Sequence, residues 1–573
     1  MRLYVFLIFS FSWLSMHSPD VRYPSGQFIS PVNRQMRLSG TFGELRSNHF
    51  HAGLDIKSAR GTIGDTVYAA GVGYISRIQV NAFGYGNVIF IDHPNGFTTV
   101  YGHLDRFAPQ FQQYVKDEQY RQQQFEVDLY PAPFQFPVSQ MDQVGILGNT
   151  GHSYGPHLHF EIRHTDTQVP VNPLHFGFMV ADQIPPVIQQ LIAYQFDDAG
   201  QLVKSSVLQP KLRAPGIYGL DIPFEIGVSR VTFGIRACDY QDGTDNQNGI
   251  YSLECEADNE PEFAFAMDEI PFQDTRYLNA HIDYQQKIYQ NRFFHRCYPL
   301  EGNKLPIYYR GVDEGMIYLN TEQPREVSIS VADFNGNISK INFEVVRNRN
   351  LFPPSALMPP FELLALPDEV SILTKPGIQV VWPKGSFYER IPLEILPLPV
   401  IRKGEFCPRY EISPSDIPVH YYFNIAIDGL SIPANLQDKA FVARCEPNGG
   451  ISNCGGTWVG GNLTSSARQM GTYTILLDTI SPTISTYKFS TNMSTWKKMS
   501  FKIYDNVKAR EKAKDLRYAA WVDGQWILMS LDGKTGVLTH EFDGRIPSGE
   551  HQLIVKVWDD RNNEGVLQKS FTL

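Results

Sequence analysis

The chain has 573 residues, of which 42% are hydrophobic, and this length allows roughly three to five folded domains. Asp and Glu outnumber Lys and Arg by 60 to 50, so the net charge of −10 makes nucleic acid an unexpected partner. No apolar run after the N-terminal one reaches transmembrane length, and we expect no transmembrane anchor in the mature protein.

The N-terminus is typical of an export signal. A basic residue, Arg2, precedes the apolar run from Leu3 to Leu14, which is too short to span a bilayer as a stable anchor. No cysteine lies near this run, which argues against a lipidated N-terminus. We therefore expect a signal peptide over residues 1–18 and export to the periplasm, the cell surface or the medium.

A short motif near the start of the mature chain contains two side chains that can bind a metal. His51 and Asp55 are four residues apart, and residues at this spacing share a face in either a helix or a strand. Gly53 between them disfavours a regular helix. Both side chains are of types that bind zinc, so this motif supplies two candidate ligands.

A β-hairpin is expected next, and it adds a third candidate residue. Strands from Asn87 to Asp92 and from Phe97 to Leu104 flank a Pro-Asn-Gly turn, which is a common hairpin connection. The second strand ends in Tyr-Gly-His, which positions His103.

An insertion of unusual composition follows, around residues 108–141. Its first part, Gln110 to Gln124, is rich in glutamine and is expected to be helical. Its second part, Leu129 to Pro137, is rich in aromatic residues and proline. We expect the insertion to lie near the site, where it could shape the substrate groove.

The segment from His157 to Arg163 alternates polar and apolar residues and predicts a strand. The apolar residues would face the core, leaving His157, His159 and Glu161 on the other face. Glu161 could orient a histidine or form a surface salt bridge.

These motifs together outline a hydrolase centre. His51, Asp55 and one of the two later histidines can hold a zinc ion and leave its fourth position open to water. The other histidine of that pair and His103 remain as acid/base groups. This suits amide hydrolysis, because the leaving amine needs a proton.

The six cysteines all lie outside the segment that carries these motifs, and none has the CxxC spacing of a zinc site. Two pairs are close enough in sequence to form disulfides, Cys445 with Cys454 and Cys238 with Cys255. Reduced, buried thiols are the alternative.

The rest of the chain is predicted to be β-rich, with short aromatic and β-branched runs between Gly, Asn and Asp turns. We expect an Ig-like domain over residues 185–347, another β-rich domain over 361–480 and a second Ig-like domain over 481–573. The first and last resemble each other, since Val331 to Asn337 is echoed by Val557 to Asn563. These Asp/Asn clusters are turn formers or calcium ligands.

The N-terminal motifs resemble those of the lysostaphin/LytM family of zinc metallopeptidases. The resemblance covers roughly residues 38 to 165 and rests on three blocks in the family's order, Gly43 to Ile56, Tyr101 to Leu104 and Gly148 to Ile162. It implies a metallopeptidase domain over residues 19–182 with an antiparallel β fold of the duplicated hybrid motif type.

The resemblance also assigns roles to the candidate residues. It implies one zinc ion per chain, bound by His51, Asp55 and His159, and it places the catalytic histidines His103 and His157 beside the reacting water. The chain as a whole is therefore expected to be mainly β, with this domain followed by about three β-sandwich domains.

By this resemblance the expected function is a secreted or periplasmic endopeptidase that hydrolyses peptide cross-bridges of bacterial peptidoglycan. One alternative is a non-catalytic regulator of cell-wall hydrolases, which the complete ligand set disfavours. Another is a surface binding protein, since the C-terminal β modules could contact a protein of the cell envelope.

Overall fold

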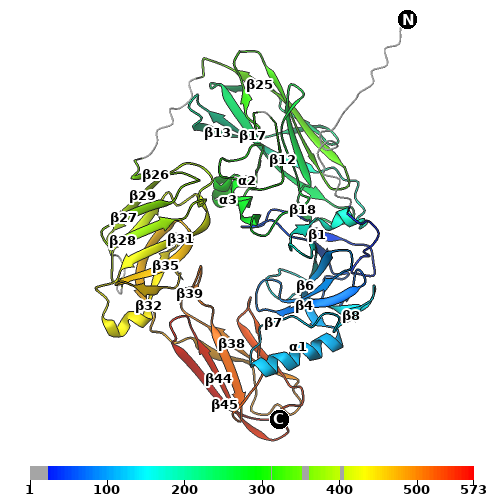
Figure 1. Cartoon of the computed structure of the whole chain (residues 1–573), viewed down its shortest axis with the longest axis vertical. Helices are drawn as coiled ribbons and strands as arrows, with labels where there is room; N and C mark the ends of the chain where they lie inside the picture. Colours follow the sequence, from blue (N-terminus) through cyan, green and yellow to red (C-terminus); the bar gives the residue numbers. More distant parts are fainter. Residues whose placement is uncertain (1–22, 312, 352–359, 401–404) are drawn as a thin grey trace.

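The computed structural model describes residues 23–311, 313–351, 360–400 and 405–573, so the expected signal peptide over residues 1–18 lies outside the described residues. Strands dominate these residues, which confirms the prediction of a mainly β chain. Four β-rich units follow one another around a closed ring, in which the last unit returns to the first (Figure 1). Among the described residues, no helix is both long and apolar enough to cross a bilayer.

The first unit is built on an eleven-stranded sheet with the central order β1-β2-β10-β6-β5-β4-β7. Its elements are β1 (Leu38–Gly40), β2 (Leu54–Lys57), β3 (Thr66–Tyr68), β4 (Gly73–Val80), β5 (Asn87–Asp92), β6 (Phe97–Phe107), α1 (Pro109–Gln122), β7 (Val127–Leu129), β8 (Pro137–Val138), β9 (Gln143–Leu147), β10 (His157–His164), β11 (Pro170–Val171) and the 3₁₀ helix η2 (Pro173–Phe176). Leu158, Phe160 and Ile162 of β10 are fully buried in the unit's core, as their alternation predicts.

The insertion forms α1, β7 and β8, and the predicted helix over its Gln-rich part is present. The expectation that the insertion shapes the substrate groove is wrong, because none of its residues lines the cleft at the candidate site. Helix α1 instead contacts the fourth unit. Lys116 forms an ion pair with Asp543 at 2.5 Å, and Arg545 lies 4.2 Å above the ring of Tyr120.

The second unit is a sandwich of a six-stranded and an eight-stranded sheet that share one hydrophobic core. Its elements are β12 (Val187–Phe196), β13 (Leu202–Leu208), β14 (Lys211–Ala214), β15 (Ile217–Gly219), β16 (Phe224–Ile226), β17 (Arg230–Tyr240), β18 (Gln247–Asn248), β19 (Ser252–Ala257), β20 (Glu260–Ala266), η3 (Thr275–Tyr277), α2 (Leu278–His281), α3 (Tyr284–Gln290), β21 (His295–Arg296), β22 (Tyr308–Arg310), β23 (Ile317–Tyr318), β24 (Arg325–Ala332) and β25 (Ile338–Arg347).

The core of the second unit includes two side chains of the first unit. Phe42 and Phe50 are each 2% exposed and belong to this core. The Phe50 ring lies 5.5 Å from the ring of His281, and its backbone N–H donates to Thr275 Oγ1 at 2.9 Å. The segment that leads to the first metal-ligand motif is therefore held in place by the second unit.

The third unit is a sandwich of a seven-stranded and a five-stranded sheet. Its elements are β26 (Leu363–Ala365), β27 (Ser371–Lys375), β28 (Ile378–Trp382), β29 (Ile391–Leu398), β30 (Arg409–Ser413), β31 (Pro418–Asp428), η4 (Ala434–Lys439), β32 (Ala440–Cys445), β33 (Ile451–Asn453), β34 (Thr457–Val459), β35 (Asn462–Gln469) and β36 (Gly471–Leu477), and β39 (Lys508–Ala509) of the following unit completes one of its sheets.

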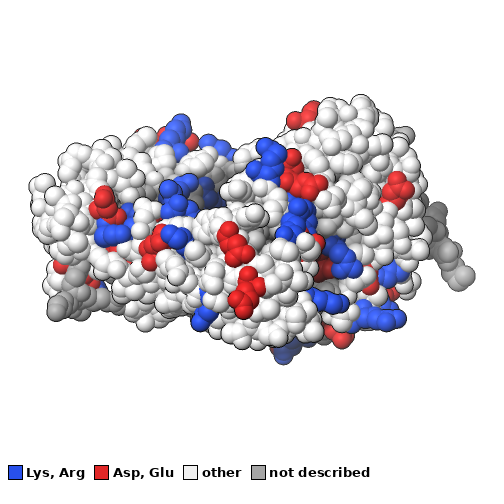
Figure 2. All heavy atoms as spheres, turned by 90° about the horizontal axis from the view of Figure 1, so that it is seen from below, with Lys and Arg blue, Asp and Glu red and all other residues white. Residues whose placement is uncertain are grey.

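The fourth unit packs two four-stranded sheets around a smaller core. Its strands are β37 (Thr483–Lys488), β38 (Lys498–Tyr504), β40 (Arg517–Val522), β41 (Gln525–Trp526), β42 (Ser530–Asp532), β43 (Val537–Glu541), β44 (Glu550–Trp558) and β45 (Glu564–Thr572). When the molecule is seen from below, basic and acidic side chains are interspersed and form no broad surface of one sign (Figure 2).

Neither of the two suggested disulfides is formed in the described residues, which include all six cysteines. Cys255 lies beside Cys297 and is not bridged to Cys238. Burial and this neighbour raise the pKa of the Cys297 thiol well above its usual value. The β cores therefore hold buried thiols, as the alternative interpretation of the cysteines predicted.

The shared core between the first two units generates a stability prediction. Phe50→Ala removes a buried aromatic side chain and should lower the free energy of unfolding of these units by about 3–5 kcal/mol. Denaturant unfolding of the full chain measures this loss. Tyr154→Ala is the matched control, because Tyr154 is 96% exposed, and it should change stability little. Equal stability of the two variants would show that Phe50 does not join the units.

Candidate metal centre

Three neighbouring strands align the candidate residues in one row. In the antiparallel ladders, Asp55 of β2 lies opposite His159 of β10, and His159 lies opposite Gly102 of β6. The strands approach closely here, since a Cβ on Gly53 would lie 2.3 Å from the backbone oxygen of Phe160. Glycine is therefore required between the two candidate ligands of the first motif.

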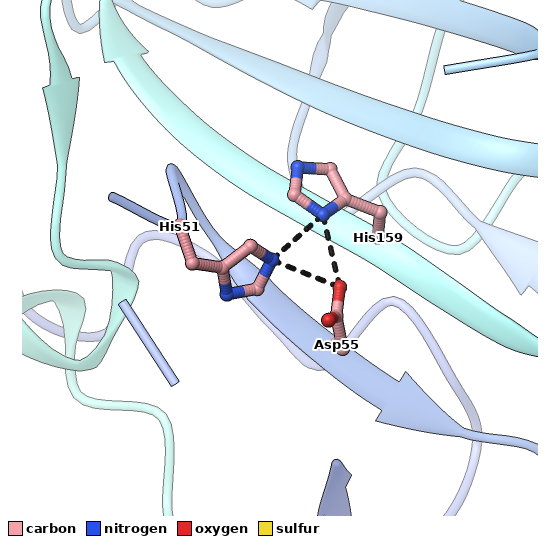
Figure 3. A group of neighbouring side chains, drawn as sticks. All are labelled: His51, Asp55 and His159. Atoms are coloured by element: carbon pink, nitrogen blue, oxygen red, sulfur yellow. Dashed lines mark hydrogen bonds and ion pairs between the residues drawn. The ribbon is translucent and has the colours of Figure 1, made fainter. Parts of the chain in front are cut away.

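The donor atoms of His51, Asp55 and His159 converge on one point (Figure 3). His51 Nε2 lies 3.0 Å from Asp55 Oδ1 and 3.0 Å from His159 Nδ1, and the latter two atoms are 2.9 Å apart. All three residues are buried. Two imidazole nitrogens and one carboxylate oxygen form the donor set of a three-ligand zinc site.

Hydrogen bonds on the far side of each ring orient the two histidines. His51 Nδ1 is 2.8 Å from the backbone oxygen of Thr41, and His159 Nε2 is 2.7 Å from Glu161 Oε1. A ring nitrogen that donates to such an oxygen leaves the other nitrogen with a free lone pair. The residues therefore fit a zinc ion, with His51 binding through Nε2 and His159 through Nδ1.

The electrostatics of Asp55 and His51 favour a bound cation. Burial by itself favours neutral Asp55, but the three surrounding histidines outweigh it and hold the pKa of this carboxyl well below its usual range. Its second oxygen, Oδ2, accepts a hydrogen bond from Arg46 at 2.7 Å. Burial lowers the pKa of His51, which keeps this ring neutral as a metal ligand must be.

Glu161 connects the ligand row to a buried network. It is fully buried and accepts hydrogen bonds from Arg163 Nε at 2.6 Å and from the Tyr85 hydroxyl at 2.5 Å. Burial raises its pKa, but Arg163 and His159 lower it more, to about 2. Despite its own burial, His159 has a pKa raised to about 9 by hydrogen bonds to Asp55 and Glu161. Glu161 is therefore an ionised carboxylate with two roles. It orients the His159 ring, and it forms a salt bridge with Arg163.

The structure brings His103 and His157 to one side of the ligand row. Their ring centroids are 4.8 Å apart, and His157 Nε2 lies 3.3 Å from Asp55 Oδ1. His103 Nδ1 is bonded to the backbone oxygen of Thr150 at 2.9 Å, and His157 Nδ1 to that of Gly155 at 2.8 Å. His103 has a φ of 60°, a left-handed backbone conformation that is uncommon for residues other than glycine.

The five residues lie at a cleft of about 1420 Å³ that both of the first two units line. This is larger than the roughly 300–1,000 Å³ of a typical small-molecule site. The second unit contributes Gly243, Thr244, Phe272 and Thr275. The first unit contributes the basic side chains Arg34, Arg37, Arg46 and Lys57. The cleft therefore has room for an extended ligand and carries positive charge near the candidate metal site.

Two regions of the chain match known families. The family described as Peptidase family M23 matches residues 49–120, and the one described as Zu5-like domain matches residues 364–478. The DD-carboxypeptidase/endopeptidase Mpg of Neisseria meningitidis serogroup B is 31% identical over 182 residues, which are 31% of this chain and 34% of Mpg. The peptidoglycan DD-endopeptidase ShyA of Vibrio cholerae is 28% identical over 161 residues, 27% of this chain and 31% of ShyA.

The matched part thus spans about a third of the length of these relatives. Among solved structures, the catalytic domain of lysostaphin from Staphylococcus simulans is 22% identical, with a TM-score of 0.19, and the match covers 25% of this chain and 91% of that one. The family and relative matches confirm the predicted resemblance to lysostaphin/LytM-type metallopeptidases.

The geometry predicts which side chains retain zinc. Asp55→Ala removes the anionic ligand and should empty the site, whereas His157→Ala removes a neighbour and should leave one zinc per chain. Elemental analysis of the purified variants measures both. Full zinc retention in Asp55→Ala would contradict the ligand set. If His157→Ala lost zinc and His159→Ala retained it, the two histidines would have exchanged roles.

Proposed function

We propose that this chain, which contains a domain of peptidase family M23, is an exported zinc endopeptidase that hydrolyses peptide cross-bridges of bacterial peptidoglycan. The observation that carries the proposal is the convergence of His51, Asp55 and His159 beside two further histidines in one cleft. The name of ShyA, a peptidoglycan DD-endopeptidase, supports this substrate class.

Zinc bound by these three residues would polarise the scissile carbonyl and lower the pKa of a water molecule toward about 7. The protein's part is to orient and fix the ligands. Glu161 and the backbone oxygen of Thr41 do this by holding the far nitrogens of His159 and His51.

His103 and His157 are proposed to move protons. When Nδ1 of each ring donates to a backbone oxygen, Nε2 is left as the acceptor. Burial, together with His159 and His157, lowers the pKa of His103 to about 3, so its ring is neutral before the reaction. An accepted proton can then be passed to the nitrogen of the leaving amine, and the protonated ring stabilises negative charge on the scissile oxygen.

The charge of the cleft supports a peptide substrate with free carboxylates, as peptidoglycan stem peptides have. Arg37 is exposed in the cleft, and Lys57 is hydrogen-bonded to the neutral Asn246. Arginine and lysine recognise carboxylates through charge-assisted hydrogen bonds. We assign these basic residues to substrate binding.

The β modules are proposed to position the catalytic unit on the wall or on a protein of the envelope. The fourth unit contacts the loop before His157, since Lys534 Nζ donates to the backbone oxygens of Asn149 at 2.6 Å and of Ser153 at 3.2 Å. The alternative, a non-catalytic regulator, is disfavoured because all three candidate ligands are present and their donor atoms converge.

Digestion of isolated sacculi by the full chain tests the function. The zinc-loaded protein should release soluble muropeptides, and His103→Ala and His157→Ala should each lose roughly two to four orders of magnitude in rate. Zinc analysis of the same preparations is the control, because both variants should retain the metal. A zinc-loaded wild type that releases nothing would indicate a non-catalytic role. Unchanged rates in both variants would contradict the assignment of the histidines.

A further inference from the structure

Three aspartates meet where the first unit joins the second, away from the candidate zinc ligands. Asp182 lies in the joining segment, Asp239 near the end of β17, and Asp333 in the turn after β24. One carboxylate oxygen from each lies within 4.8 Å of the others. Asp239 and Asp333 are 4% and 5% exposed. The chain thus brings two buried acidic groups and one half-buried acidic group together at one junction.

No positive side chain balances this charge. Among the described residues, none of the three aspartates forms an ion pair with a lysine or an arginine. Burial and the two neighbouring carboxylates raise the pKa of Asp239 to about 8, and burial and Asp333 raise that of Asp182 to about 6. Buried like charges without a counter-charge are costly unless a cation binds them.

A fourth oxygen points to a ligand independently of the acidic residues. Asn248 of β18 lies directly opposite Asp239 in the β17–β18 ladder, so both side chains are on the same face. Asn248 is 4% exposed, and its Oδ1 has no hydrogen-bond partner. Asn248 and the three aspartates line one cavity of about 30 Å³. A buried amide oxygen without a donor, at a cavity of this size, fits a bound ion.

The same arrangement recurs where the third unit joins the fourth. Asp478 lies in that joining segment, Asp505 follows β38 and Asp559 follows β44, and their oxygens also lie within 4.8 Å of one another.

The hydrogen bonds correspond as well. Asn337 Nδ2 donates to the backbone oxygen of Asp182 at 3.2 Å and to Asp333 Oδ2 at 2.7 Å. Asn563 Nδ2 donates to the backbone oxygen of Asp478 at 3.0 Å and to Asp559 Oδ2 at 2.8 Å. The two echoed Asp/Asn segments of the sequence therefore build the same junction twice.

We propose that Asp182, Asp239, Asp333 and the amide oxygen of Asn248 bind one calcium ion. The donors are all oxygens, which hard cations prefer, and three carboxylates supply the charge. Calcium–oxygen distances of about 2.3–2.6 Å place two ligands of one ion at most about 5 Å apart, and the three carboxylate oxygens meet this limit. The ion ties the joining segment to a strand end and a turn, so it fixes the orientation of the first unit against the second.

Calcium binding to the full chain tests the proposal and does not depend on peptidase activity. After removal of calcium with a chelator and reloading of zinc, titration calorimetry should detect calcium binding. Asp239→Asn should bind one calcium fewer than the wild type. Asp245→Asn, an exposed residue of the same loop, is the matched control and should bind as the wild type does.

Thermal unfolding separates a calcium site from an acidic cluster without a ligand. Calcium should raise the unfolding temperature of the wild type by at least about 2–4 °C. Without calcium, Asp239→Asn should be more stable than the wild type, because the substitution removes like-charge repulsion. Calcium should raise the unfolding temperature of Asp239→Asn less than it raises that of the wild type. The proposal would be overturned if Asp239→Asn bound as many calcium ions as the wild type. It would also be overturned if the wild type bound magnesium more tightly than calcium.

Discussion

The registration of β10 between β2 and β6 is the constraint on which the candidate site depends. Because Asp55, His159 and Gly102 lie opposite one another, a shift of one residue in either ladder would turn His159 to the other face of the sheet. The apolar side chains of β10 prevent this shift, since they are fully buried on the core side. The same hydrophobic pattern that forms the strand therefore positions the chemistry.

The second constraint is the closure of the four units into a ring. The contacts between the first and fourth units include ion pairs, a cation–π contact, the aromatic pair Tyr120–Trp526 and the hydrogen bonds of Lys534 to the loop before His157. In the described residues the first and fourth units keep separate hydrophobic cores, whereas the first and second units share one. The second unit is an integral part of the cleft, since it contributes Phe272 and Thr275 to the lining.

The sequence predicted the residues of the site better than their surroundings. Short motifs with fixed spacing identified the five candidate residues, because period-two alternation and a four-residue spacing translate directly into shared faces. The partners that orient them were not predictable in the same way. Tyr85 lies in a turn without a recognisable pattern, and the oxygens of Thr41 and Thr150 belong to the backbone. Only the folded chain shows which distant groups orient the candidate residues.

Long-range packing explains the expectations that were wrong. The composition of the insertion predicted its helix but carried no information on which unit α1 would contact. Phe50 belongs by sequence to the first motif, yet its side chain is buried in the core of the next unit. Sequence proximity also suggested disulfides for cysteines that the β-sheets keep apart, whereas Cys255 meets Cys297.

The central claim is that three side chains hold one zinc ion through specified atoms. Anomalous diffraction from crystals of the zinc-loaded protein, recorded on both sides of the zinc absorption edge, tests it most directly. We predict one peak about 2.0–2.2 Å from His51 Nε2, Asp55 Oδ1 and His159 Nδ1. A peak bound by His103 or His157 in place of one of these residues, or no peak at this point, would contradict the account.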